Sequence, residues 1–285
     1  MKKILLTCFA LCFIVLLTSC AVSCSGYEKE VYEVKDTFRS IEVDDMDASI
    51  IIKPSTDGKC RVTADENKSV YRKVEVKNGV LKIDRQKRVL GFIFFSSFKE
   101  VIVEIELPEK EYSSLKIQSV SGRIEVQEGL AFDVVELEST SGSVKFYSVV
   151  KDEIEAESTS GSVTVSSYSS PDKVDCRSVS GSVTITDIKG EEIKAKSTSG
   201  SIKLKNVTAS DEMTLETTSG SINLDKCDGN EIYIESTSGS VKGTLLSEKR
   251  FKTKSTSGSI NIPYSNNGGI CKIKTTSGSV NIDII

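Results

Sequence analysis

Acidic side chains that recur nineteen residues apart are the groups in this sequence best suited to chemistry. Glu136 is followed by Glu155, and Glu138 by Glu157. If successive repeats stack, each pair lies on one face, and paired carboxyl groups are what glycosidase-type hydrolysis requires. The 285-residue chain contains no His, the commonest general base and metal ligand. Rows of solvated charge are therefore the preferred interpretation, and a polysaccharide-acting enzyme is the alternative.

Hydroxyl side chains form the second pattern, because Ser-Thr-Ser-Gly-Ser or a close variant recurs along the chain. The Thr that stands two positions before seven of the nine repeat glycines is predicted to point outward, as a stripe that could bind a glycan or a protein surface. Turn chemistry alone also explains Ser and Gly at a corner, and a regular Thr row raises ice or mineral binding as a further hypothesis. The candidate binding stripe is Thr140, Thr159, Thr198, Thr218, Thr237, Thr256 and Thr276.

A glycine recurs nine times at intervals of 19 or 20 residues and divides the last two-thirds of the chain into repeats. Self-similarity at a fixed period near twenty is typical of a solenoid, in which each repeat stacks on its neighbours and none folds alone. The repeat-corner glycines are Gly122, Gly142, Gly161, Gly181, Gly200, Gly220, Gly239, Gly258 and Gly278.

Apolar residues alternate with polar ones on both sides of each glycine, which predicts two short half-buried strands per repeat. The inward positions lie seven and five residues before the glycine and two and four after it, as at Ile154, Ala156, Val163 and Val165. We expect the glycine to take a positive φ between the strands. A Ser or Thr three residues before each glycine also faces inward, which predicts an internal ladder of hydroxyls bonded to one another and to the backbone.

The rest of each repeat closes the circuit and carries one more apolar residue about seven positions after the glycine, which predicts a third face or a turn that fills the core. These residues are Val149, Tyr168, Ile188, Val207, Cys227 and Leu246. The predicted fold is therefore all-β: a single-stranded parallel β-solenoid with about 19–20 residues per coil and an N-terminal β cap.

Charged residues four positions before the glycines predict ion pairs between neighbouring coils, because parallel strands place equivalent positions side by side. The expected pairs are Glu157–Arg177, Lys196–Glu216 and Glu235–Lys254. Exposed pairs contribute less than about 1 kcal/mol each, so burial of the aliphatic positions must dominate stability.

The first nineteen residues predict a lipoprotein signal peptide. Lys2 and Lys3 precede an apolar stretch too short to span a bilayer comfortably, and the stretch ends in Leu17-Thr18-Ser19-Cys20. This ending resembles the bacterial lipobox, in which the cysteine becomes the lipidated first residue. Cys20 is thus the predicted anchor to the bacterial cell membrane or outer membrane, facing outside the cytoplasm. An ordinary cleaved signal is the alternative.

The remaining chain is predicted to comprise a tether at 20–36, degenerate N-terminal β coils or a cap at 37–112, and the nine-repeat solenoid at 113–285. Ile41–Ile52 reads as a degenerate coil with Asp-Ala-Ser at its corner, and Asn78-Gly79 predicts a hairpin turn. The aromatic cluster at Phe92–Phe98 is expected to be buried in the cap, with an exposed contact loop as the alternative.

The C-terminal residues Ile282–Ile285 carry no polar cap. An open apolar edge invites pairing with another chain, so we expect either a self-capping final coil or self-association through this edge. The five cysteines after Cys20 have no close pairs and no zinc-type spacing, and three of them occupy core positions of the repeat. We expect mostly free, buried thiols.

Composition excludes several classes of function. Lys and Arg number 37 against 41 Asp and Glu, so the chain lacks the basic balance of a nucleic-acid-binding protein. The corners carry hydroxyls where calcium-binding repeats carry carboxylates. We expect no cofactor, no structural metal and no nucleic-acid partner.

The Ser-Gly-Ser corners, for example Ser160-Gly161-Ser162 and Ser238-Gly239-Ser240, together with Ile41–Val43 and Ile50–Pro54, resemble a bacterial β-strand-repeat family of unknown function whose members carry an adhesin label. The resemblance covers residues from about 37 to 285. It implies an exported or membrane-tethered protein with a right-handed solenoid, and it supplies no catalytic residues. The expected function is a non-catalytic envelope lipoprotein that binds, adheres or acts as a scaffold, with envelope-stress sensing as an alternative.

Overall fold

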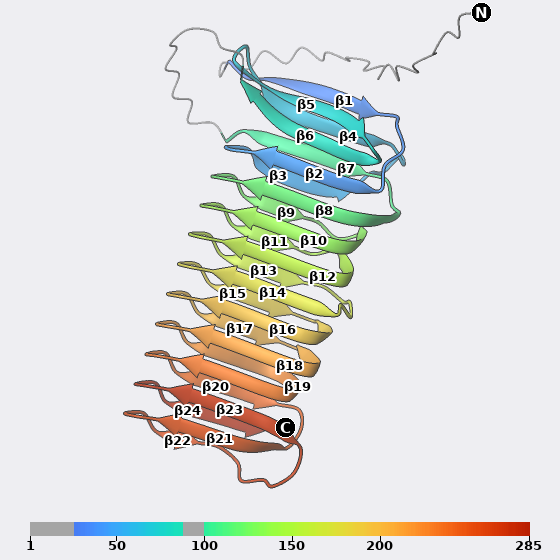
Figure 1. Cartoon of the computed structure of the whole chain (residues 1–285). Coiled ribbons are helices and arrows are strands. Elements are labelled where there is room, and N and C mark those ends of the chain that lie inside the picture. Colours follow the sequence, from blue (N-terminus) through green and yellow to red (C-terminus); the bar gives the residue numbers. More distant parts are fainter. Residues whose placement is uncertain (1–25, 88–99) are drawn as a thin grey trace, which may run out of the picture.

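The fold consists of two β-sheets wound from one chain. The computed structural model describes residues 26–87 and 100–285, which contain 24 strands and no helix. Each coil gives one strand to each sheet, and the coils stack into a column (Figure 1). The predicted all-β parallel solenoid is therefore confirmed. No helix in this part of the chain is long and apolar enough to cross a membrane.

Each regular coil runs from a strand of one sheet, here called sheet B, through a first corner to a strand of sheet A, and returns through a second corner. The sheet B strands of these coils are β8 (Glu111–Ser119), β10 (Ala131–Ser139), β12 (Val149–Ser158), β14 (Lys173–Ser178), β16 (Lys189–Ser197) and β18 (Thr208–Thr217). The sheet A strands are β9 (Ile124–Val126), β11 (Val144–Phe146), β13 (Val163–Ser166), β15 (Val183–Thr186), β17 (Ile202–Lys205) and β20 (Val241–Leu245). Strand β19 (Ile222–Ser236) continues around the second corner and belongs to both sheets.

Equivalent repeat positions pair in register across the parallel strands. Leu137 lies beside Ala156, and Ala156 beside Cys176. All three side chains are buried, as are the other predicted inward side chains of the regular coils; Gly243, which has no side chain, is the exception. Burying one Val, Leu or Ile side chain contributes about 1.5–3 kcal/mol. Four such positions per coil therefore outweigh the exposed ion pairs, as the sequence predicts.

The second corner is a turn, and the described coils form no third face. Asp187, Asn206 and Lys226 take φ values of 59°, 51° and 54° there, and the chain re-enters sheet B directly. Of the six apolar residues predicted to fill this turn, Ile188, Val207 and Cys227 are buried. The prediction is wrong for the other three, because a neighbouring residue takes the inward place in two of those coils (Val150 and Leu245 are buried). The exposed three are Val149, Tyr168 and Leu246.

The nine corner glycines lie in one column, but the prediction that they take positive φ is wrong. None of them is among the described residues with positive φ. A Cβ on Gly161 would lie 2.1 Å from the carbonyl oxygen of Gly142 in the neighbouring coil, and the corresponding distances for the nine glycines are 1.7–2.2 Å. Glycine is required because the backbones of successive corners approach too closely for any side chain.

The buried hydroxyls before the glycines satisfy the backbone at this close approach. The amide N–H of Gly161 donates to Ser158 Oγ at 2.9 Å, and Ser158 Oγ donates to the carbonyl of Gly142 at 2.9 Å. The same pair of bonds recurs at Ser139, Ser178 and Ser197. The predicted ladder exists, but its bonds run to the backbone of two coils and not between hydroxyls.

The last two repeats stack in the reverse of their sequence order. The C-terminal coil, β23 (Gly269–Thr275) and β24 (Val280–Ile284), lies between the β19–β20 coil and the coil formed by β21 (Lys249–Ser255) and β22 (Ile260–Asn261). Gly278 accordingly abuts Gly239, and Gly258 abuts Gly278. The C-terminal strand is covered on both sides, so the open edge belongs to β21 and β22 and not to residues 282–285.

Burial explains this order. Cys271, Ile273, Val280 and Ile282 of the inserted coil are buried. The coil at the end has Thr253 at a position that is apolar in most other coils, and burying a hydroxyl without a partner costs a few kcal/mol. The more apolar coil therefore occupies the interior.

The N-terminal strands form a cap in which insertion occurs again. They are β1 (Glu28–Val34), β2 (Ser40–Asp45), β3 (Ser49–Pro54), β4 (Cys60–Glu66), β5 (Val70–Lys77), β6 (Val80–Lys87) and β7 (Ile102–Leu107). The β2–β3 coil lies between β8–β9 and β6–β7, and β1, β4 and β5 add antiparallel strands. The degenerate coil and the Asn78-Gly79 hairpin are confirmed. Strand β1 lies within the segment predicted as a tether, so residues 28–34 belong to the fold. Cys20, Cys24 and the Phe92–Phe98 cluster lie outside the described residues.

The corner geometry makes a quantitative prediction. Substituting Gly161→Ala should lower the free energy of unfolding by about 3 kcal/mol or more, the upper end of overpacking, because the clash is with backbone and cannot be relieved by a rotamer change. Ser158→Ala should cost about 1–3 kcal/mol, because it leaves the Gly161 N–H and the Gly142 carbonyl unpaired. Urea denaturation measures both. Exposed Thr159→Ala is the control, and its free energy of unfolding should stay within about 0.5 kcal/mol of the wild type. Equal effects at all three positions would contradict this account of the corner.

Candidate functional site

A shallow groove runs along sheet B beside the first corners of six consecutive coils, with a volume of about 500 Å³. Its floor is the row of buried hydroxyl residues, one wall is the charged row one position earlier, and the other wall is the Thr stripe. The lining residues are Glu138, Ser139, Glu157, Ser158, Thr159, Arg177, Ser178, Val179, Lys196, Ser197, Thr198, Glu216, Thr217, Thr218, Glu235 and Thr237. The groove therefore follows from the repeat itself, because in each coil an inward hydroxyl residue lies between two residues whose side chains point outward.

The seven Thr residues predicted as a stripe are all exposed. Four of them, Thr159, Thr198, Thr218 and Thr237, line the groove, and the other three continue the row beyond its ends. Val120 and Val179 interrupt the row at 44% and 48% exposure. Neighbouring strands lie about 4.8 Å apart, so the stripe offers a hydroxyl at nearly every step along the column.

The charged wall is largely neutralised within itself. Arg177 contacts Glu157 at 2.5 Å, and Lys196 contacts Glu216 at 2.7 Å, as predicted. The predicted Glu235–Lys254 pair is wrong, because the inserted coil places Lys274 against Glu235 at 2.6 Å. The groove therefore presents polar groups with little net charge over its central coils.

The acidic pairs proposed for catalysis lie side by side, since Glu136 is in register with Glu155 and Glu138 with Glu157. Each pair contains carboxylates engaged by cations: Lys116 Nζ lies 2.5 Å from Glu136, and Arg177 lies 3.2 Å from Glu155. Partial burial, followed by the charge of Glu157, raises the pKa of Glu155. The arrangement is a row of ion pairs along the outward face of sheet B.

The described cysteines are free and buried, as predicted. Burial raises the pKa of the Cys60 and Cys271 thiols to about 12 and that of Cys227 to about 11. Burial also raises the pKa of Cys176. A thiol is a nucleophile only as thiolate, so these four side chains serve the core.

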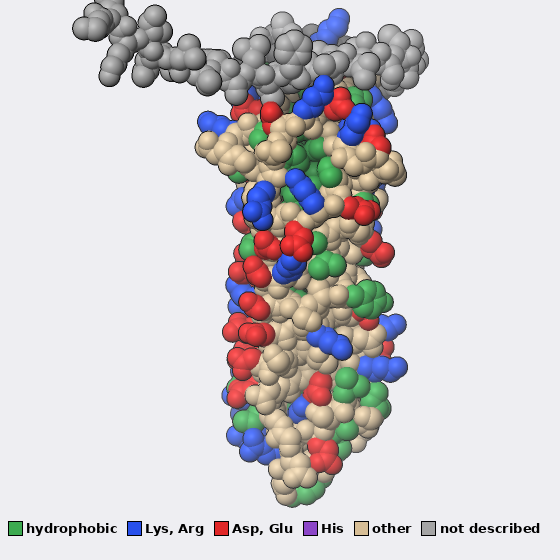
Figure 2. Space-filling view, turned by 90° about the vertical axis from the view of Figure 1, so that its right-hand side faces the viewer, with side chains coloured by type: hydrophobic (Ala, Val, Ile, Leu, Met, Phe, Trp, Pro, Cys, Tyr) green, Lys and Arg blue, Asp and Glu red, His purple; other side chains and the backbone are tan. Residues whose placement is uncertain are grey.

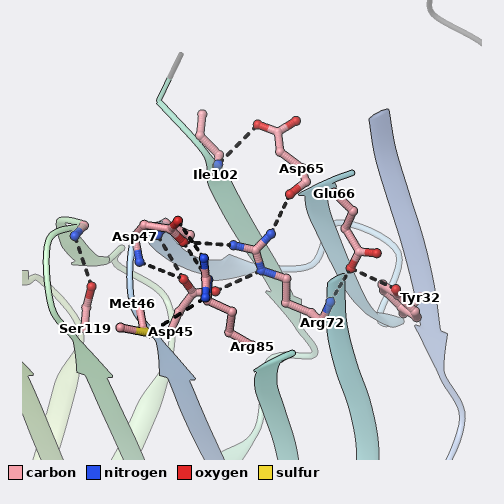
Figure 3. Close-up of polar contacts among 12 residues, drawn as sticks. Tyr32, Asp45, Met46, Asp47, Asp65, Glu66, Arg72, Arg85, Ile102 and Ser119 are labelled. Carbon is pink, nitrogen blue, oxygen red and sulfur yellow. Dashed lines mark hydrogen bonds and ion pairs between the residues drawn. The ribbon is translucent and has the colours of Figure 1, made fainter. Parts of the chain in front are cut away.

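Sequence reasoning missed a buried polar cluster in the N-terminal cap (Figure 3). Arg72 is fully buried; its Nε donates to Asp45 Oδ2 at 2.9 Å and its Nη1 to the carbonyl of Asp65 at 2.6 Å. The other oxygen of Asp45 accepts the amides of Asp47 and Ala48. Asp45 thus holds the ladder position of the first coil, and aligning Ala48 with the corner glycines would have revealed it.

The cluster is structural, and its ion pair gives a pH-dependent prediction. Burial opposes ionisation of Asp45, but Arg72 and the two backbone amides outweigh it, and its pKa lies below the usual value. The stability it contributes is therefore present above the ordinary carboxyl pKa of about 3.9 and is lost as the pH falls through the lower folded value.

Asp45→Ser should destabilise the protein by about 3–5 kcal/mol at pH 7, because it leaves Arg72 buried and unpaired. Asp45→Ser combined with Arg72→Met should recover most of that loss, since Ser restores the ladder bond used by the other coils. The double variant should also lose less stability than the wild type between pH 5 and pH 3. Urea titrations at several pH values test this, and a double variant as unstable as Asp45→Ser would refute the assignment.

The chain matches the model of the family described as Toastrack DUF4097 over residues 38–232 and 172–285. A crystal structure from Parabacteroides distasonis, described as a putative adhesin, is similar at TM-score 0.55 and 16% identity, covering 91% of this chain and 98% of that one. Another from Bacteroides fragilis with the same description has TM-score 0.49 and 16% identity, over 91% and 97%. None of the curated proteins compared matches the sequence. At these identities the likeness concerns the fold alone.

Proposed function

The chain belongs to the Toastrack DUF4097 family, and from this premise we propose that it is a non-catalytic cell-envelope lipoprotein that binds an extended, hydroxyl-rich glycan in the groove along sheet B. The observation that carries the proposal is the groove itself, in which charged side chains repeat over six coils and exposed Thr hydroxyls line four of them. A binding role is also what the adhesin label of the Parabacteroides distasonis protein describes for that protein.

The groove suits a polymer better than a small molecule. It is open and elongated, whereas sites for small ligands usually bury most of the ligand surface in a concave pocket. An elongated ligand running along the column meets the same contacts at each step, and weak contacts repeated along one chain add up through high effective concentration.

The charge balance favours a neutral polar ligand. Arg177 and Lys196 already neutralise Glu157 and Glu216. A strongly anionic polymer would have to displace these pairs, whereas sugar hydroxyls can both donate to the carboxylates and accept from the Thr side chains. Glycan is therefore the ligand class that the groove complements.

Substituting Thr198, Thr218 and Thr237 by Val should weaken glycan binding at least tenfold, because each lost hydrogen bond contributes about 0.5–1.5 kcal/mol. Binding of the purified protein to a panel of cell-wall and mucin glycans would be measured by calorimetry. The matched control replaces Thr164, Thr184 and Thr186 of sheet A by Val. Equal loss in both variants, or no binding to any glycan, would contradict the proposal. Glycan turnover that Glu155→Gln abolishes would instead establish the enzyme.

Lipidation at Cys20 would tether the column at its N-terminal end and leave the groove free along its length. Cys20→Ala should therefore shift the protein from the membrane fraction to the soluble fraction and remove the mass added by acyl chains. Cys24→Ala is the control and should change neither. Membrane association that survives Cys20→Ala would refute this anchor.

A further inference from the structure

The C-terminal end of the column carries a cluster of basic side chains. The outward side chains of β21 are Arg250, Lys252 and Lys254, and those of the neighbouring β23 include Lys272 and Lys274. The reversed stacking brings like charges together, because Lys252 lies beside Lys272 and Lys254 beside Lys274. Only Lys274 of these five has an ion pair among the described residues. Figure 2 shows the change of sign along its left-hand edge, from acidic side chains over the middle coils to basic ones near the lower end.

The strands at the same end, β21 and β22, are edge strands of their sheets. Among the described strands, β21 pairs only with β23, and β22 only with β24. Edge strands of this kind offer a row of unpaired backbone N–H and C=O groups to another chain. The hydroxyl ladder stops here too: Ser255 Oγ donates to the carbonyl of Gly278 at 3.1 Å, whereas the carbonyl of Gly258 receives no hydroxyl from the residues described.

The core is also open at this end. Ile260 is 41% exposed and Phe251 is half-buried, although the corresponding side chains of the interior coils are buried. The tip therefore combines a free backbone edge, uncovered aliphatic and aromatic surface and a row of cations, of which Arg250, Lys252 and Lys254 have no ion pair among the described residues and Arg250 Nε donates to the carbonyl of Gly268 at 3.1 Å.

We propose that the edge formed by β21 and β22 binds an extended segment of a partner protein in which acidic and apolar residues alternate. Added beside β21, such a segment would place its acidic side chains against Arg250, Lys252 and Lys254 and its apolar ones over Phe251. A Ser or Thr followed three residues later by Gly would continue the ladder, since the corner at Gly258 leaves no room for a side chain in the next layer. This surface is distinct from the groove and does not rest on its ligand.

Charge argues against a second copy of this chain as the occupant. A tip-to-tip contact would set the cations of two β21 strands against each other. A head-to-tail contact would bring β21 towards β5, whose outward side chains include Lys73, Glu75 and Lys77; Lys73 is already paired with Glu75 at 2.7 Å, and Lys77 leaves this face with a net positive charge. Like charges on neighbouring strands are destabilising, so an acidic segment is favoured over both arrangements.

The test uses the full chain and a synthetic peptide of sequence EIEVESTSG, with KIKVKSTSG as the matched peptide control. Fluorescence anisotropy should show binding of the acidic peptide only, with an affinity that falls as salt is raised. Lys252→Glu with Lys254→Glu should weaken binding at least tenfold. Lys203→Glu with Lys205→Glu, on the exposed face of sheet A, makes the same change in net charge and should leave binding intact. Hydrogen exchange should show protection of the β21 amides when the peptide is bound.

Several results would overturn the proposal. These are the absence of binding, equal binding of the basic peptide, and an equal loss in the two charge-reversed variants. Concentration-dependent dimers that light scattering detects and that the Lys252→Glu, Lys254→Glu variant abolishes would assign the edge to self-association. Binding to anionic phospholipid vesicles through the same lysines, without peptide binding, would assign it to a membrane surface. Glycan binding by the groove would be unaffected in each case, so failure here is distinguishable from failure of the proposed function.

Discussion

The column depends on the contact between backbones at the first corner. Each corner glycine lies against the carbonyl of the corner residue in a neighbouring coil, a glycine in every case but Gly122, and a Cβ there would come within about 2 Å of that oxygen. The approach is stable only because a buried hydroxyl accepts one amide and donates to the carbonyl of the neighbouring coil. Glycine and serine thus fix the spacing of the corners, and the aliphatic positions on either side fill the core that this spacing creates.

The two ends of the column satisfy the backbone groups of this contact in different ways. At the N-terminal end the corner has Ala48, and the oxygen of its carbonyl faces Gly122. Asp45 replaces the ladder hydroxyl there, and its second oxygen pairs with Arg72, which antiparallel strand β5 provides. A carboxylate can therefore end the ladder where a cap strand supplies a buried cation. At the C-terminal end, no cation among the described residues meets the ladder, and the carbonyl of Gly258 receives no hydroxyl from them.

The sequence predicts the regular coils well, because nine copies of one pattern average out local ambiguity. The inward positions, the stacked glycine column and the pairs Glu157–Arg177 and Lys196–Glu216 follow from alternation and period alone. The φ of the corner glycines could not be predicted in this way. Glycine is selected both by a positive φ and by close backbone approach, and only the position of the neighbouring coil shows which of the two applies. The order of the last two coils could not be predicted from the charge pattern either. Either stacking order places a lysine beside Glu235: Lys254 if the coils follow the sequence, and Lys274 in the order observed. Thr253, at a position apolar in most coils, was the available signal that this coil ends the column.

The two proposed surfaces differ because the repeat treats them differently. Along the groove most coils contribute the same hydroxyls, and most charges pair with opposite charges on neighbouring coils. This surface therefore favours a long ligand that forms hydrogen bonds over a charged one. At the tip the inserted coil carries the charge that pairs with Glu235, and Arg250, Lys252 and Lys254 of β21 have no ion pair among the described residues. A ligand of the groove can therefore be neutral and repetitive, whereas the occupant of the tip has to bring negative charge and its own backbone edge. The insertion that protects the C-terminal strand is thus also what concentrates positive charge at the one end where pairing remains open among the described coils.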